Sequence, residues 1–458
     1  MKLNVLLIVV DTLRKDHLGC YGYRHNTSPN IDRLAKDGAV FTNAYASDVP
    51  TIPSFTALLT GQRGISTCII SNKQTEISRQ IIPLPHLLSE RGITTCAVSS
   101  LAAWKPWFSW GFNYYLNPAA GQPGRVQLVT ADEINSYAIP WIRQHKKENF
   151  FMFLHYWDVH WPYWPPKEFR GLFYKEIDLN DPTVLIRNRG TPNPVMRQWM
   201  TQRKRRDHRP IPGPYREDVA YVTDLYDGEI RYVDYHIGEI LNTLEEEDIY
   251  DRTMVILTAD HGEHNARNHM ELYEPVINIP FIVRHPEFPA CKIEALIQNI
   301  DVAPTVLEAF NIPSEIETQL EGRSLFPLLE GKTETGYEEI HTWMVNSRTI
   351  RVGTWKYIEN FTPLRPPQEL YNLEKDPLEN NNLVEEEKEM LNQLQRRLKE
   401  WMVSELGSKP DPIMFLREMR KREMERKYVT IQDYGRRRVN APRLRWKYHD
   451  SPYKYPVL

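Results

Sequence analysis

The chain has little cysteine, no long hydrophobic run and no large excess of charge of either sign. Its 458 residues include four cysteines, which are not spaced as a disulfide framework. No stretch approaches the ~20 apolar residues of a transmembrane helix. The formal net charge of -3 gives no reason to expect bulk nucleic-acid binding. These absences predict reduced thiols, a cytoplasmic location, and neither a membrane nor a nucleic-acid partner.

Short apolar runs of strand length alternate with helical patterns through most of the chain. Residues 3–10 are followed directly by Asp11, and no signal-peptide cleavage site follows. We therefore interpret them as a buried strand rather than a signal peptide. The predicted strands are 3–10, 95–99, 150–156, 253–258 and 281–284, and the predicted helices are 31–38, 55–60, 84–91 and 233–246. The alternation predicts an α/β catalytic domain over residues 1–334, in which helices cover both faces of a mostly parallel sheet.

The pattern changes after residue 334. Two apolar segments, 341–345 and 349–359, precede a helical pattern from about 385 to 403. We therefore predict a C-terminal subdomain over residues 335–405, with a small antiparallel sheet and a helix.

Two segments fall outside this regular pattern. Residues 165–215 are rich in proline and arginine and predict a long excursion that forms a lid or a contact surface. Residues 406–458 are basic and aromatic, and we interpret them as an oligomer-contacting tail of a homodimer or homotetramer.

Three predicted strands are followed by side chains that can carry chemistry. Asp11 ends the first, Asp158 and His160 follow the third, and Asp260 and His261 follow the fourth. In an open α/β sheet, ligands bind outside the carboxyl ends of the strands. Each residue alone is weak evidence, because an aspartate in this position is often a helix cap or a loop residue. Their shared position predicts that they converge.

Asp11, Asp260 and His261 form an oxygen and nitrogen ligand set that suits one divalent cation, with Mn²⁺ or Zn²⁺ favoured and Ca²⁺ possible. Thr51, just before a short apolar helical run, is the candidate fourth ligand. A bound cation would lower the pKa of its hydroxyl and create a nucleophile. The alternative is that Thr51 is a plain helix N-cap.

Several motifs occur in the same order as in one family. They are VVDTLRKDHLGCYG (9–22), TSPNIDRL (27–34), TIPSFTALLTG (51–61), DVHWPY (158–163), ADHGE (259–263), LYE (272–274), DVAPT (301–305) and ELYNLEKDP (369–377). With these motifs the chain resembles, from residue 3 to about 403, the sulfatase family of the alkaline phosphatase superfamily. The resemblance implies an alkaline-phosphatase-like α/β fold with a smaller C-terminal antiparallel sheet.

The departures from the family pattern concern the reaction itself. The family's cysteine or serine, which is oxidised to formylglycine, is replaced by Thr51, which cannot be converted in that way. Side chains that bind sulfate or metal in the family are replaced at five further positions, by Thr12, Phe55, Ser100, Ala102 and His269. Four of these residues, Phe55, Ser100, Ala102 and His269, replace basic side chains, which predicts a pocket that is poor in cations.

The resemblance also implies roles for individual residues. In this superfamily, phosphodiesterases use a threonine nucleophile, and phosphonate monoester hydrolases carry an asparagine at the position of Asn72. His160 resembles the family's substrate-binding histidine and is a candidate proton donor, and Ser100 is a candidate substrate contact. His269 is a candidate general acid or ligand to a second metal.

We therefore expect a metal-dependent hydrolase of small phosphodiesters or phosphonate monoesters that acts through a phosphothreonine on Thr51. One alternative is a hydrolase of sulfuric esters with an unusual nucleophile. Another is an inactive binding protein on the same fold, which the retained Asp11, Asp260 and His261 argue against.

Overall fold

The computed structural model describes residues 3–74, 76–175, 216–263, 271–313 and 319–418. The described residues up to Lys409 belong to one compact unit, and those from Pro410 onwards belong to a second. The predicted excursion lies partly outside the described residues, and so does most of the predicted oligomer-contacting tail.

An eight-stranded sheet forms the centre of the larger unit, in the order β4-β3-β5-β1-β6-β7-β2-β8. All neighbouring pairs are parallel except the two that involve β7. The strands are β1 (Asn4–Val10), β2 (Ala39–Tyr45), β3 (Thr94–Val98), β4 (Tyr114–Leu116), β5 (Phe150–Tyr156), β6 (Thr253–Thr258), β7 (Asn278–Arg284) and β8 (Cys291–Gln298). The predicted mostly parallel sheet is confirmed.

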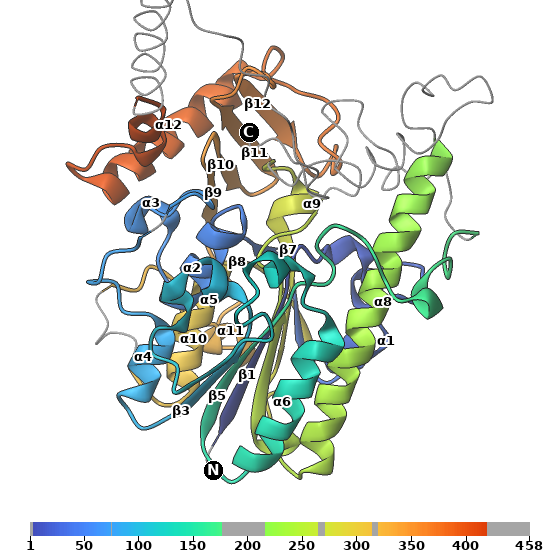
Figure 1. Ribbon diagram of the computed structural model, residues 1–458. Helices are drawn as coiled ribbons and strands as arrows, with labels where there is room; N and C mark the ends of the chain where they lie inside the picture. The colour runs from blue at the N-terminus through green and yellow to red at the C-terminus, as the bar shows by residue number, and fades with distance from the viewer. Residues whose placement is uncertain (1–2, 75, 176–215, 264–270, 314–318, 419–458) are drawn as a thin grey trace, which may run out of the picture. The chain divides into compact units, whose positions relative to one another are not determined.

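Helices cover both faces of this sheet (Figure 1). One layer contains α1 (Pro29–Lys36), α6 (Ala131–His145) and α8 (Arg216–Glu246). The opposite layer contains α2 (Thr51–Thr60), α4 (Leu84–Ser89), α5 (Leu101–Trp104), α10 (Val302–Ala309) and α11 (Phe326–Leu329). Because both faces are covered, every residue of β1, β5 and β6 is buried, which explains their continuous apolar sequences.

A second sheet of four antiparallel strands, ordered β12-β11-β10-β9, lies in the C-terminal part of this unit. Its strands are β9 (Glu339–Met344), β10 (Ser347–Val352), β11 (Trp355–Asn360) and β12 (Gln368–Asn372), and α12 (Lys388–Leu406) packs against them. The small sheet with its helix is as predicted. However, the single strand predicted over 349–359 is wrong, because Gly353 takes a positive φ of 55° and turns the chain between β10 and β11.

Other predicted boundaries also need correction. Helix α2 begins at Thr51, four residues before the predicted start, because Pro53 is tolerated in its first turn. Helix α8 is 31 residues long and extends well before the predicted start at residue 233. The sequence did not predict strands β2, β4 and β8 or helices α6 and α10. The short helices α3 (Gly64–Thr67) and α9 (Glu274–Ile277) are further elements of this unit.

The segment that enters α2 is hydrogen-bonded to the small sheet. The Val49 amide donates to the Trp343 carbonyl (2.8 Å), and the Trp343 amide donates to the Ser47 carbonyl (3.0 Å). Asp48 between them is fully buried and accepts hydrogen bonds from the Gly64 amide (2.9 Å) and the Ser47 hydroxyl (2.8 Å). The small sheet therefore takes part in positioning the helix that begins with Thr51.

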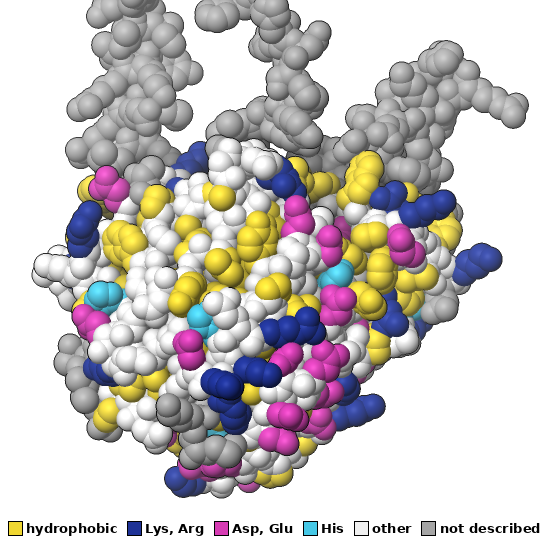
Figure 2. All heavy atoms as spheres, turned by 60° about the horizontal axis from the view of Figure 1, so that its bottom comes forward, with side chains coloured by type: hydrophobic (Ala, Val, Ile, Leu, Met, Phe, Trp, Pro, Cys, Tyr) yellow, Lys and Arg dark blue, Asp and Glu magenta, His cyan; other side chains and the backbone are white. Residues whose placement is uncertain are grey.

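The surface in Figure 2 carries acidic and basic side chains close to one another, and the described side chains form no broad patch of a single sign on that face. No helix in the described part of the chain is long and apolar enough to span a membrane.

Asp48 predicts a pH dependence of stability. Burial raises its pKa to about 7, whereas an unfolded aspartate titrates near pH ~3.9. Between these two pH values the folded protein keeps a proton on Asp48, whereas the unfolded chain has lost it. The contribution of Asp48 to the free energy of unfolding is therefore fully present below about pH 4 and is lost as pH rises through 7. Asp48→Asn keeps an acceptor for Gly64 but does not titrate.

We therefore expect the free energy of unfolding of Asp48→Asn, relative to the parent, to increase between pH 4.5 and 7.5 by a few kcal/mol, at about 1.4 kcal/mol per pKa unit. Urea denaturation at several pH values measures this difference. Other buried carboxylates titrate in both proteins and cancel. Parallel pH profiles would contradict the assignment.

Candidate functional site

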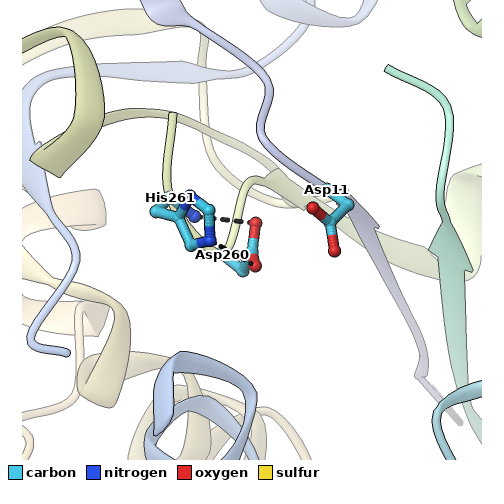
Figure 3. Close-up of side chains that lie close together, drawn as sticks. All are labelled: Asp11, Asp260 and His261. Atoms are coloured by element: carbon cyan, nitrogen blue, oxygen red, sulfur yellow. Dashed lines mark hydrogen bonds and ion pairs between the residues drawn. The ribbon is translucent and has the colours of Figure 1, made fainter. Parts of the chain in front are cut away.

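The predicted convergence of Asp11, Asp260 and His261 is present in the structure. Strands β5, β1 and β6 are neighbours and run in parallel, so their carboxyl ends meet at one edge of the sheet. One ligand atom from each of the three side chains lies within 4.8 Å of the other two, and all three are fully buried. Figure 3 shows the side chains facing the same space from the ends of two strands.

The backbone after β1 is strained at this point. The Asp11 amide continues the strand ladder by donating to the Tyr156 carbonyl (2.9 Å). Thr12 then takes a positive φ of 57°, which is rare for a β-branched residue and costs about 1–3 kcal/mol. Its amide donates to Asp260 Oδ1 (3.0 Å), and its carbonyl accepts a bond from the Tyr226 hydroxyl (2.8 Å). These two bonds hold the turn that presents Asp11.

The two aspartates have acceptor atoms that the protein does not satisfy. Asp260 Oδ1 accepts bonds from the amides of Thr12 and His261 (2.8 Å). In contrast, Asp260 Oδ2 and both Asp11 oxygens are buried without a hydrogen-bond partner among the described residues. Buried acceptors without donors are costly. A cation bound between the two carboxylates would compensate for the missing donors.

His261 is oriented as a metal ligand. Its Nδ1 lies 2.8 Å from the Gly262 carbonyl oxygen, and because a carbonyl only accepts, Nδ1 must carry the hydrogen. In the neutral ring, Nε2 then holds a lone pair. Nε2 lies 3.3 Å from Asp260 Oδ2 and 3.4 Å from Thr51 Oγ1.

Thr51 is the first residue of α2 and is 1% exposed. The N-cap position belongs to Pro50, so Thr51 is not the plain N-cap of the alternative interpretation. Helix α2 is fixed to the loop after β6 because the Ser54 hydroxyl donates to the Asp260 carbonyl (2.7 Å). Asn299 Nδ2 donates to the Ser54 hydroxyl (2.9 Å). Of the predicted ligand set, the Thr51 hydroxyl contacts His261.

The electrostatics of the site favour a cation. Burial, followed by the nearby carboxylates of Asp260 and Glu263, raises the pKa of Asp11 well above its ordinary value. Three buried carboxylates close together repel one another, and a divalent cation would reverse this penalty. The donor set, with its unsatisfied oxygens, fits a cation well.

The remaining predicted residues lie in different settings. Asn72 Oδ1 accepts a bond from the Ile52 amide (3.0 Å), so Asn72 lies at the start of α2. The Ser100 hydroxyl donates to the Val126 carbonyl (2.7 Å) and accepts from Trp157 Nε1 (2.5 Å). A substrate oxygen would have to compete with the Val126 carbonyl for the only hydrogen of Ser100.

His160 lies in the loop after β5, where its ring packs against Trp157 and Trp161. Its Nδ1 donates to the Trp161 carbonyl (2.6 Å), so Nε2 is the nitrogen that can exchange a proton. Asp158, two residues earlier, accepts a bond from the Ala131 amide (2.6 Å) at the start of α6. This is the helix-capping role that an aspartate after a strand often has. His269 lies outside the described residues.

Sequence reasoning did not single out the supporting residues Tyr226, Ser54 and Asn299, because a tyrosine or serine in a helix carries no local signal of its partner. His155 is different. It interrupts the apolar run of β5, and its Nε2 lies 3.5 Å from Asp11 Oδ2. A histidine inside an otherwise apolar, fully buried strand is a signal that the sequence itself carries.

Residues 3–312 match the sulfatase family, and residues 262–405 match the C-terminal region of N-sulphoglucosamine sulphohydrolase. The first match covers more than half of the chain, so the protein belongs to the sulfatase family and is a hydrolase. Members of this family are metal-dependent, in agreement with the cluster at Asp11.

Individual relatives are similar at low identity. Iduronate 2-sulfatase from Homo sapiens is 27% identical over 382 residues, which cover 72% of this chain and 68% of the relative. An arylsulfatase from Clostridium perfringens is 25% identical and covers 87% of this chain and 94% of its own.

Solved structures share the fold. The structure of BT4656 in complex with its substrate D-glucosamine-2-N,6-O-disulfate has a TM-score of 0.75 at 21% identity, and covers 90% of this chain and 99% of its own. The phosphonate monoester hydrolase from Silicibacter pomeroyi has a TM-score of 0.69 at 19% identity, with 89% and 96% coverage. These similarities show that the chain has a sulfatase-like fold.

The site predicts the effect of Asp260→Asn on metal content. The amide oxygen can replace Oδ1 as acceptor for the Thr12 and His261 amides, whereas the unsatisfied Oδ2 becomes an NH₂ group that cannot bind a cation. We expect metal analysis of the purified parent to find one divalent cation per chain, and the variant to lose it.

Asp234→Asn is the matched control. Asp234 is also fully buried and accepts bonds from the backbone amides of Asn30 and Ile31, at the start of α1, so its replacement should leave metal content unchanged. Full metal content in Asp260→Asn would contradict the ligand assignment.

Proposed function

We propose that the protein is a metal-dependent hydrolase of phosphodiesters or phosphonate monoesters, with Thr51 as the nucleophile. The observation that supports this most directly is the position of Thr51 Oγ1, 3.4 Å from Nε2 of the ligand His261 at the start of α2. Asp11, Asp260 and His261, with Thr51, are the proposed ligands of one cation, for which we favour Mn²⁺ or Zn²⁺ because of the imidazole.

The bound cation would supply charge that favours the ionised form of the Thr51 hydroxyl and the developing negative charge of the reacting group. Thr51 loses its proton to solvent, and Oγ1 forms a bond to phosphorus while the bond from phosphorus to the leaving oxygen breaks. The imidazolium form of His160 is the proposed proton donor to that oxygen, through Nε2, and the ring takes up a proton from solvent again after the step. Water then attacks the phosphorus of the phosphothreonine, releases the product and restores the Thr51 hydroxyl.

The surroundings of Thr51 suit an anion with a single charge. The amide NH₂ of Asn72 is a proposed donor to a phosphoryl oxygen, since its Oδ1 is already engaged by Ile52. The start of α2 favours an anion as well. The positions that carry cationic sulfate-binding side chains in the family hold Phe55, Ser100 and Ala102 here. Ser100 remains a weaker proposed contact, because its hydroxyl already donates its hydrogen to the Val126 carbonyl.

The second candidate is a sulfuric ester hydrolase, because the curated relatives are named sulfatases. A formylglycine hydrate carries two hydroxyl groups, so its sulfate adduct can expel sulfate by using the second. Thr51 offers one hydroxyl and lacks this route. The phosphonate monoester hydrolases among the structural neighbours are consistent with the phosphorus-based proposal.

Substitutions at Thr51 test the nucleophile. Thr51→Ala removes the covalent route, and we expect kcat to fall at least several hundred-fold, which corresponds to about 4 kcal/mol. Thr51→Ser keeps the hydroxyl and should retain measurable activity. Steady-state kinetics on a phosphodiester measures both variants, and near-parent turnover by Thr51→Ala would instead indicate direct attack by water.

Comparison of four nitrophenyl esters tests the substrate class. With one metal, we expect kcat/KM for the phosphodiester or phosphonate monoester to exceed that for the phosphate monoester, because the monoester carries up to two negative charges in a pocket that is poor in cations. The sulfate ester should be the slowest. A sulfate ester at the top of this ranking would overturn the proposal in favour of the second candidate.

A further inference from the structure

His155 is a buried histidine that none of the preceding steps uses. It lies near the end of β5 and pairs with Val9 of β1. Paired residues of neighbouring strands project to the same face, and so does the residue two positions further along a strand. Asp11 follows Val9 by two positions, so His155 and Asp11 project to the same face of the sheet.

The imidazole of His155 connects Asp11 to the neighbouring strand. Its Nε2 lies 3.5 Å from Asp11 Oδ2, and its Nδ1 lies 3.2 Å from the hydroxyl oxygen of Ser99, just after β3. The first distance is about half an ångström longer than a usual N–H···O bond. In the part of the chain that the structure describes, neither Nε2 nor Asp11 Oδ2 has a hydrogen-bond partner.

Aromatic rings also pack against His155. Phe55 of α2 packs edge-on against the imidazole with ring centroids 4.6 Å apart, and Trp157 does so at 4.8 Å. The side chain is fully buried. In its neutral form an imidazole carries one hydrogen, on one of its two nitrogens. Ser99 on one side and Asp11 on the other decide which nitrogen holds it.

The geometry points to His155 as a positioning residue for Asp11: Nδ1 accepts the Ser99 hydroxyl hydrogen, and Nε2–H donates to Asp11 Oδ2. Asp11 Oδ2 is then held by the imidazole, and Oδ1 is turned toward the cation. Hydrogen bonds to the outer oxygen of a ligating carboxylate orient it and raise its affinity for metal. The inference rests on the proposed function only in taking Asp11, Asp260 and His261 as the metal site.

Direct titration of metal-free full-length protein with Mn²⁺, followed by the electron paramagnetic resonance signal of free Mn²⁺, tests this role without any substrate. We expect His155→Phe, which keeps the aromatic volume and removes the donor, to weaken Mn²⁺ affinity about 10- to 100-fold. His155→Gln places an amide NH₂ near the position of Nε2 and should recover most of the affinity.

His341→Phe is the matched control, since His341 is another buried histidine whose Nε2 has no hydrogen-bond partner among the described residues. It stacks on Trp401 of α12, and its replacement should leave Mn²⁺ affinity unchanged. Urea unfolding without metal identifies any general loss of stability in each variant. If His155→Phe does not fold, His155→Gln alone tests the inference. Near-parent Mn²⁺ affinity in this variant would support it, and a large loss of affinity would contradict it.

Three results would overturn the inference. One is parent-like Mn²⁺ affinity in His155→Phe, and another is equal weakening in His341→Phe. The third is loss of a nitrogen coupling to bound Mn²⁺ in His155→Gln, which would identify His155 as a direct ligand. Failure of all four esters to react would contradict the proposed function but not this inference, whereas a parent that does not bind Mn²⁺ would contradict both.

Discussion

The site holds buried carboxylates that repel one another, and it therefore needs a positive charge between them. Asp11 and Asp260 are fully buried, with three oxygen atoms that no donor among the described residues satisfies. The fold holds them there through the pairing of β1 with β5 and β6 and through the strained turn at Thr12. A buried, repulsive and unsatisfied pair of this kind is costly for an empty site, so the polar groups around it are best understood as arranged for a cation. His261 is oriented with its Nε2 lone pair available, and Thr51 lies next to that nitrogen. Both features also suit a bound cation.

Much of the architecture could be predicted from sequence because the parallel sheet is covered on both faces. Buried strands such as β1 and β5 are continuous apolar runs, and the residue after each run marks the edge where ligands bind. Asp11 and Asp260 were found in this way. Strand β8 was missed because exposed residues interrupt its apolar pattern, and the hairpin between β10 and β11 was missed because its turn depends on the conformation of one glycine.

The supporting contacts could not be predicted, because they join residues that are distant in the chain. Tyr226 bonds the carbonyl of Thr12 from the middle of α8, and Asn299 reaches Ser54 of α2. Such partners are fixed by tertiary packing and leave no local pattern. For Asp158 the local pattern was present but ambiguous, because an aspartate after a strand is as typical of a helix cap as of a ligand. The hydrogen bond that Asp158 accepts from the Ala131 amide identifies it as a cap.

The hydrogen bonds between β9 and the segment that leads into α2 affect the order in which parts of the chain can fold during synthesis. The hydroxyl of Thr342 donates to the carbonyl of Ala46, a residue 296 positions earlier in the chain, and Trp343 pairs with Ser47 and Val49. During synthesis the N-terminal part of a chain emerges first and begins to fold first. The backbone around Thr51 therefore cannot be completed until β9 has left the ribosome. A nascent chain that ends before β9 contains Thr51 but lacks the hydrogen-bond partners of the segment that leads into α2.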